Sequence, residues 1–253
     1  MSLTRGTPAT DVLWHDLECG GYDRDLPLWR ALAAEAEGRG LELGCGTGRV
    51  SLALAHEGHE VVGVDTDRAL VDAFNERAQA AGLDAKALCA DIRHPHPPGP
   101  FGAVLAPMQV IQLLGGPADR ERALRAAALR LGANAALACA IVEGAPAEAG
   151  LDGTDDATRP LPDVREQDGW VYSSLPLGAA VEGDALVVSR LRQVVSPDGE
   201  LREELHRDEL AVLTAAQLER EAADAGLRVR ERLEVPESEA HIGSVVLVLE
   251  AAP

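Results

Sequence analysis

Residues 40–49 read Gly-Leu-Glu-Leu-Gly-Cys-Gly-Thr-Gly-Arg, and the rest of the chain is best interpreted outward from this stretch. A short apolar segment typical of a strand breaks at Gly44, Gly46 and Gly48, and a helical pattern then runs to Gly58. A strand that turns through glycine into a helix brings bare backbone and a helix N-terminus close to a ligand. The pattern therefore predicts a ligand-binding turn, although a tight structural turn would share it.

A second apolar run supports the ligand-binding interpretation. Residues 60–65, Glu-Val-Val-Gly-Val-Asp, are continuous and β-branched, as in a buried parallel strand. The run ends in Asp65, about 20 positions after the glycines, where a carboxylate is placed to accept hydrogen bonds from ribose hydroxyls. The ligand is therefore expected to be a nucleoside-containing cofactor.

The spacing of the glycines separates two kinds of nucleoside cofactor. The dinucleotide fingerprint is G-x-G-x-x-G, and its last glycine allows close packing beside a pyrophosphate. Here the pattern is G-x-G-x-G, and Arg49 stands where that last glycine would be. Glu42, just before the turn, is unfavourable beside a pyrophosphate but suits a ligand with a positive amine or sulfonium. S-adenosylmethionine carries an adenosine ribose, an ammonium and a sulfonium and has no phosphate, so it fits better than NAD.

Residues 42–48 together with residues 62–65 resemble the first two motifs of the class I S-adenosylmethionine-dependent methyltransferases. The resemblance implies an α/β, Rossmann-like sheet that is mostly parallel, with an antiparallel last strand and helices on both faces. It covers most of the chain, because the expected core repeats span roughly residues 35–142 and 213–250.

The same resemblance implies roles for further residues. Asp91, after the third strand, would hold the adenine amino group, and Ile92 would pack on the adenine ring. Tyr22 belongs to a Tyr-Asp pair that would lie over the methionine end of the cofactor, unless the N-terminal segment is only a surface anchor. The expected cofactor-binding residues are Tyr22, Glu42, Gly44, Cys45, Gly46, Asp65, Thr66, Asp91, Ile92, Ala106 and Met108.

The acceptor is expected at the carboxyl end of the fourth strand, residues 101–106, because ligands bind at this edge of open parallel sheets. The segment that follows resembles the fourth methyltransferase motif but lacks the polar or aromatic residue that many relatives carry there. Gln109 and Gln112 are its polar groups. Residues expected to contact the acceptor are Gln109, Gln112, Trp170, Tyr172 and Arg190.

Alternating segments in the second half of the chain predict a small antiparallel sheet inserted into the α/β pattern. They lie at residues 169–174, 185–195 and 200–206, whereas residues 1–25 and 143–167 are expected to be irregular. The predicted division is a lid and first part of the core (1–148), an inserted sheet covering the site (149–208), and a last helix with a closing strand pair (209–253).

The composition argues against several classes of partner. With 42 acidic and 23 basic residues the formal net charge is −19, so a phosphate backbone would be repelled and nucleic acid is not expected. The sequence has no signal peptide pattern, no apolar run long enough to cross a membrane and no paired cysteine spacing, which favours the cytoplasm. His94 and His96 lack partners at metal-binding spacing, so no metal is expected. A monomer and a homodimer both remain open.

The predicted function is methyl transfer to a small-molecule acceptor by in-line displacement, for which the protein must align the reactants and exclude water. A base helps if the acceptor is a hydroxyl or an ammonium. His206, on the inserted sheet, and His15, in the N-terminal segment, are the weak candidates. The alternatives are a non-catalytic S-adenosylmethionine-binding regulatory or partner-binding protein and a nicotinamide-dependent oxidoreductase. The acceptor, and whether methylation is at N, O or C, stay open.

Overall fold

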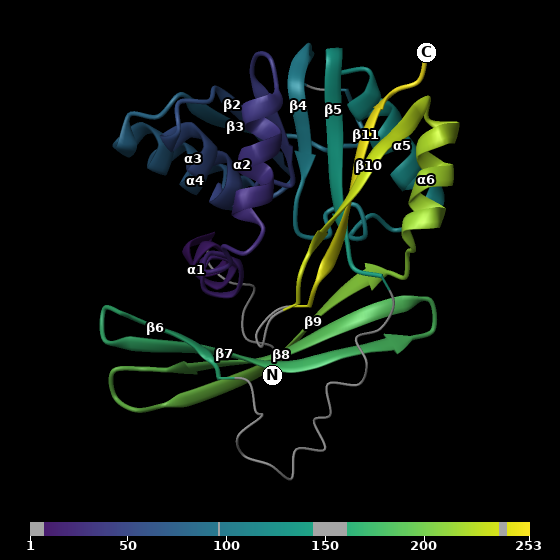
Figure 1. Cartoon of the computed structure of the whole chain (residues 1–253). Helices are drawn as coiled ribbons and strands as arrows, with labels where there is room; N and C mark the ends of the chain where they lie inside the picture. The colour runs from purple at the N-terminus through teal and green to yellow at the C-terminus, as the bar shows by residue number, and fades with distance from the viewer. Residues whose placement is uncertain (1–7, 96, 144–160, 238–241) are drawn as a thin grey trace.

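The computed structural model describes residues 8–95, 97–143, 161–237 and 242–253, which form two sheets and the helices around them (Figure 1). The larger sheet has seven strands in the order β10-β11-β5-β4-β1-β2-β3, and the smaller has four in the order β6-β7-β8-β9. Neighbouring strands from β3 to β5 are parallel, whereas β11 runs antiparallel to both β5 and β10. The predicted fold class is confirmed.

The elements have the following bounds. The strands of the larger sheet are β1 (Gly40–Leu43), β2 (Val61–Asp65), β3 (Ala85–Cys89), β4 (Phe101–Ala106), β5 (Leu131–Ile141), β10 (Leu227–Val235) and β11 (Ser244–Ala251). Those of the smaller sheet are β6 (Asp163–Gln167), β7 (Trp170–Glu182), β8 (Ala185–Val195) and β9 (Leu201–Ala211). The described helices are α1 (Pro8–Cys19), α2 (Leu26–Glu35), α3 (Arg49–His56), α4 (Arg68–Ala81), α5 (Pro117–Ala128) and α6 (Ala215–Asp224).

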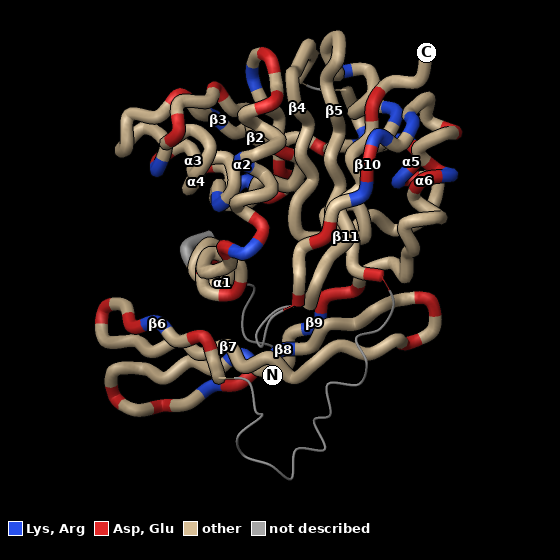
Figure 2. Tube along the Cα trace, in the orientation of Figure 1, with Lys and Arg blue, Asp and Glu red and all other residues tan. Residues whose placement is uncertain are grey.

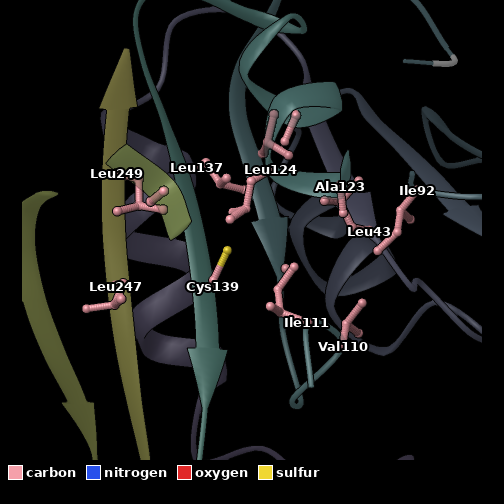
Figure 3. Close-up of a cluster of buried hydrophobic side chains, with 14 of the residues drawn as sticks. Leu43, Ile92, Val110, Ile111, Ala123, Leu124, Leu137, Cys139, Leu247 and Leu249 are labelled. Atoms are coloured by element: carbon pink, nitrogen blue, oxygen red, sulfur yellow. The ribbon is translucent and has the colours of Figure 1, made fainter. Parts of the chain in front are cut away.

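Helices cover both faces of the larger sheet because its buried strands carry apolar side chains on both sides. Val62 and Val64 of β2 belong to the cluster formed with α5 and α6, part of which Figure 3 shows, whereas Val61 belongs to the cluster formed with α2 and α3. Phe74 on α4 packs with Cys45 just after β1. Successive residues of one strand thus serve opposite layers.

Local capping residues mark several helix ends. Asp67 caps α4 by accepting from the backbone N–H groups of Ala69 and Leu70, and Gly82 ends the helix in a left-handed conformation. Thr214 and Gln217 form a capping box at the start of α6. These local signals fix where the helices that flank the sheet begin.

Two regions predicted to be irregular are ordered. Residues 8–19 form α1, whose side chains Leu13 and Trp14 are buried, so tertiary packing stabilises a helix with no clear apolar stripe in its sequence. Residues 163–167 form β6, which joins β7 through Asp168 and Gly169, both at positive φ (52° and 79°). This Asp-Gly pair is a hairpin signal, and the sequence interpretation missed it.

Charge is spread over the molecule. Figure 2 shows acidic positions on both sheets and on most helices, with arginines interleaved among them. This distribution fits a general surface charge better than one anionic site. No helix in the described part of the chain is long and apolar enough to span a membrane.

Candidate functional site

The candidate site lies where the parallel strands of the larger sheet end, on the side that faces the smaller sheet. The glycine turn follows β1 at this edge, and Figure 1 shows α1 between the larger and the smaller sheet. Helix α1 contacts both neighbours: Asp16 accepts from the Thr47 hydroxyl at 2.8 Å, and Glu18 accepts from Arg192 of β8 at 2.7 Å. Helix α1 therefore adjoins both the glycine turn and the smaller sheet.

The glycine turn has a backbone that only glycine can adopt at these positions without strain. Gly44 and Gly46 have φ angles of 65° and 51°. A Cβ at Gly44 would lie 2.6 Å from Val110, and a Cβ at Gly46 would lie 2.2 Å from Nε2 of His15. Neighbouring groups thus approach the bare backbone closely on the side where a ligand is expected.

Asp65, at the end of β2, binds the turn. Its Oδ2 accepts from the Gly46 N–H at 2.8 Å and its Oδ1 from the Asp67 N–H at 2.9 Å. Each carboxylate oxygen has two lone pairs, so each can accept one further hydrogen bond. The carboxylate thereby orders the turn and retains the acceptor capacity that a ribose diol requires.

Glu42 has a structural contact that the sequence did not predict. Its side chain is 3% exposed, and Oε2 accepts from the Ser51 N–H at 2.8 Å and from the Ser51 hydroxyl. Ser51 is the third residue of α3, so the carboxylate satisfies one of the free N–H groups at that helix N-terminus. Burial raises the pKa of Glu42 to about 7. That Glu42 faces the positive group of the cofactor stays a prediction.

Asp91 and Ile92 lie after β3, but their environments differ. Asp91 accepts hydrogen bonds from the Arg93 guanidinium and, at 2.9 Å, from the Arg93 backbone N–H. These hydrogen bonds lower the pKa of Asp91 to about 2. Arg93 also reaches Asp119 near the start of α5 at 3.2 Å. Ile92 is buried in the cluster with α5 and α6 (Figure 3). Their adenine roles stay predictions.

Arg49, the residue that replaces the last glycine of the dinucleotide fingerprint, fixes the segment between α1 and α2. Its guanidinium lies 5.1 Å from the ring centre of Tyr22 and donates to the Tyr22 carbonyl at 2.8 Å. It also donates to both carboxylate oxygens of Asp25, at 2.6 and 2.8 Å, and Asp25 accepts from Trp29. Tyr22 is thereby held beside the start of α3, next to the glycine turn.

The segment after β4 has strained backbone. Met108 and Gln109 are non-glycine residues with φ angles of 48° and 60°, and only Pro107 separates them from the fully buried end of the strand at Ala106. Such conformations are held in place by their surroundings and cluster at functional sites. Both residues lie at the edge where the acceptor is expected.

Gln112 is engaged elsewhere. Its side chain is 1% exposed, donates to the carbonyls of Val142 and Ala211 at 3.1 and 3.0 Å, and accepts from the Val142 N–H at 2.7 Å. These bonds use the amide to join the ends of β5 and β9. They favour a structural role over the predicted contact with the acceptor.

The smaller sheet turns one face toward the core. Leu186 and Leu210 pack with Val142 at the end of β5, which defines this inner face. Alternation then puts further residues of β7, β8 and β9 on the same face: Trp170, Tyr172, Ser174, Val188, Arg190, Arg192, His206 and Asp208.

Contacts across the inner face are mostly to α1. Tyr172 meets Trp14 of α1 edge-on, with ring centres 5.7 Å apart. Arg190 donates to the Ser174 hydroxyl at 2.8 Å and lies 3.6 Å from Glu18. The structure therefore brings Tyr172 and Arg190, from the acceptor prediction, onto the face that adjoins α1.

The two candidate bases lie on different elements. His206 Nε2 is 3.3 Å from Asp208 Oδ1 on the inner face, and this contact lowers the pKa of Asp208. His15 lies against Gly46 with its Nδ1 3.3 Å from the Thr47 hydroxyl, and burial lowers its pKa. His96 lies outside the described residues, among which no three His, Cys, Asp or Glu side chains are grouped to hold a metal ion.

Comparison with known proteins gives two findings. Residues 41–133 match the protein family described as methyltransferase domain. No curated protein sequence matches the chain.

Solved structures with the same fold cover nearly the whole chain. The sugar N-methyltransferase KedS8 from Streptoalloteichus is 22% identical, with a TM-score of 0.73 over 94% of this chain and 92% of that one. An S-adenosylmethionine-dependent methyltransferase from Clostridium acetobutylicum is 12% identical, with a TM-score of 0.70 over 97% and 98%. CalS10, an amino pentose methyltransferase from Micromonospora echinaspora, is 17% identical, with a TM-score of 0.66 over 98% and 99%.

Proposed function

We propose that this chain, a class I S-adenosylmethionine-dependent methyltransferase by its methyltransferase domain and its fold, methylates a small molecule held between the core and the smaller sheet. The observation that carries the proposal is the glycine turn bound to Asp65 through the Gly46 N–H, with the inner face of the smaller sheet nearby across α1. The glycine turn with Asp65 suits the nucleoside of the methyl donor, and the inner face of the smaller sheet is where residues can differ according to the acceptor.

The donor half consists of the turn and the ends of β2 and β3. Asp65 offers its remaining lone pairs to the ribose, Asp91 to the adenine amino group, and Tyr22 and Met108 lie toward the methionine end. Glu42 supplies negative charge beneath the turn, which favours an ammonium or a sulfonium. These assignments, like those of the other residues predicted to bind the cofactor, follow from the family resemblance and the geometry at this edge of the sheet.

The acceptor half consists of the segment after β4 and the inner face of the smaller sheet. Gln109, Trp170, Tyr172 and Arg190 are its proposed contacts. A small-molecule acceptor is supported by structurally similar proteins that act on sugars, including KedS8 and CalS10. The proposed division of the chain remains a lid with the first part of the core, an inserted sheet over the site and a closing unit, with the sheet running from Asp163 to Ala211.

The chemistry asks little of the protein beyond alignment. S-adenosylmethionine, when bound, would supply an electrophilic methyl carbon, which the acceptor attacks in line with the carbon–sulfur bond, and S-adenosylhomocysteine would be the leaving group. The chain holds the acceptor in register and excludes water, which are effects of orientation. Where the acceptor carries an N–H or O–H, a proton must leave, and His206 is our candidate for the base. The Asp208 carboxylate can only accept, so in the 3.3 Å contact the Nε2 of neutral His206 is the donor, and the Nδ1 carries the lone pair that can accept a proton.

Calorimetric titration tests the donor half. We expect S-adenosylmethionine and S-adenosylhomocysteine to bind and NAD not to bind. Binding of NAD without S-adenosylmethionine would end the proposal. Release of S-adenosylhomocysteine is then measured with a panel of amino sugars, simple amines and alcohols, because a non-catalytic cofactor-binding protein would bind the donor without transfer to any of them.

A further inference from the structure

The imidazole of His15 covers the glycine turn at one defined place. Its Nε2 and Cε1 lie 2.2 and 2.5 Å from the position that a Cβ would take at Gly46, so no side chain other than hydrogen is compatible with this contact. Asp16, the next residue, fixes the helix here by accepting from the Thr47 hydroxyl and from Arg77 of α4 at 2.5 Å. The contacts of Asp16 with the turn and with α4 therefore hold the neighbouring His15 in this position.

The hydrogen bonds around Thr47 identify the tautomer of His15. The Thr47 hydroxyl has one hydrogen, and at 2.8 Å it donates this hydrogen to Asp16, whose carboxylate can only accept. In the 3.3 Å contact between Thr47 and His15, the Nδ1 of His15 must therefore be the donor. The Nε2, which lies against Gly46, is then left with its lone pair.

That lone pair adjoins the group that binds the ribose in the proposed function. Gly46, which Nε2 covers, donates its N–H to Asp65, and Asp65 is close enough to His15 to influence its titration. A ribose that reaches Asp65 thus also lies beside His15. It presents two hydroxyls to two acceptors.

We propose that His15 is a cofactor-binding residue whose Nε2 accepts a hydrogen bond from one ribose hydroxyl of S-adenosylmethionine, while Asp65 accepts from the other. This inference rests on the proposed function and deepens it at the donor half. It removes His15 from the candidate bases and leaves His206 alone in that role.

A cycle of variants and ligands tests the contact. Affinities for S-adenosylhomocysteine and for its 2′-deoxy and 3′-deoxy forms are measured by calorimetry for the unchanged protein and for His15→Ala. Loss of one neutral hydrogen bond should weaken binding of S-adenosylhomocysteine by about three- to tenfold. One deoxy ligand should bind both proteins equally, because it lacks the hydroxyl that His15 contacts.

The outcomes separate this inference from the proposed function. An equal loss with all three ligands would show that His15 acts only by docking α1, and no loss would remove His15 from the site; either overturns the inference alone. Failure of the unchanged protein to bind S-adenosylhomocysteine overturns the proposed function as well. His56→Ala, at an exposed position of α3, is the matched control and should bind all three ligands normally.

A second variant covers the case in which His15→Ala fails to fold. His15→Gln should bind S-adenosylhomocysteine with intermediate affinity, because its amide reaches the place of Nε2. In the unchanged protein, affinity should fall as the pH drops through the pKa of His15, since the imidazolium has no lone pair. The charged groups that face His15 are Asp16 and Glu18 on its own helix, Asp65 on β2 and Arg77 on α4. An identical pH profile for His15→Gln overturns the inference.

Discussion

Replacing Glu42 with glutamine should remove a pH dependence from the stability of this fold. The carboxyl is buried beneath the glycine turn, and burial raises its pKa from the ordinary 4.5 to about 7. Between these values the folded protein holds a proton that the unfolded chain has released. Stability is therefore greatest below about pH 4.5, falls as the pH rises, and levels off above about pH 7.

The size of the effect follows from the two pKa values. At 1.36 kcal/mol per pKa unit, the gap between 4.5 and about 7 corresponds to about 3 kcal/mol of unfolding free energy lost above neutrality. Glutamine is a neutral isostere, and its carbonyl can still accept from the Ser51 N–H and hydroxyl. Glu42→Gln should match the unchanged protein near pH 5 and exceed its stability by about 2–3 kcal/mol at pH 8.

Urea unfolding without ligand, repeated from pH 5 to pH 8.5, measures this difference. Taking the difference between the two proteins cancels the titration of every other group. Glu60→Gln, at an exposed position just before β2, is the control and should run parallel to the unchanged protein. Parallel profiles for Glu42→Gln would refute the assignment of a raised pKa to this carboxyl.

The same measurement with saturating S-adenosylhomocysteine tests where Glu42 faces. If the carboxylate lies near the ammonium, the ligand favours the ionised form and lowers its pKa, so the pH dependence of the unchanged protein flattens. A slope that the ligand leaves unaltered would limit Glu42 to its contact with the start of α3.

Three other substitutions test the site. Asp65→Ala should weaken binding of S-adenosylhomocysteine by tenfold or more in calorimetry, because hydrogen bonds to a charged group contribute about 1.5–3 kcal/mol; unchanged affinity would remove the ribose assignment. Gln112→Ala leaves backbone groups of Val142 without partners and should lower the free energy of unfolding by about 1–3 kcal/mol; normal stability would show that the amide does not join β5 to β9. Gly46→Ala should displace α1 through His15 and change the fluorescence of Trp14, and His15→Gly in the same chain should restore it; a normal spectrum in the single variant would contradict the contact.

The parts of the fold that local patterns specify could be predicted from the sequence. The turn at Gly44–Gly48, Asp65 after its strand, and the caps at Asp67 and Thr214 depend on residues within a few positions of one another. Helix α1 could not be predicted, because the contacts that hold it, such as Asp16 with Arg77 and Glu18 with Arg192, join residues 61 and 174 positions apart.

Two features of the site depend on distant contacts or on a strand end that local sequence patterns do not show. Gln112 is predicted to contact the acceptor because a polar residue after a strand end is typical of a site, whereas its observed amide contacts are with Val142, just after β5, and with Ala211 of β9. The pair His206 and Asp208 follows the alternation of one strand, but the predicted strand ended at residue 206, whereas β9 continues to Ala211. A predicted strand that continued to residue 211 would have placed His206 and Asp208 on the same face of the sheet.

The amide of Gln112 has a consequence for how such a chain can change. It binds Val142, where the chain leaves the larger sheet, and Ala211, where the chain returns from the smaller sheet. The two ends of the inserted segment that contains the smaller sheet are therefore joined at one point. An inserted segment whose ends meet can be lengthened, shortened or exchanged while the seven-stranded sheet keeps its structure. With the acceptor held on the smaller sheet, as in the proposed function, we expect acceptor preference to evolve, or to be engineered by grafting, independently of the residues that bind the methyl donor.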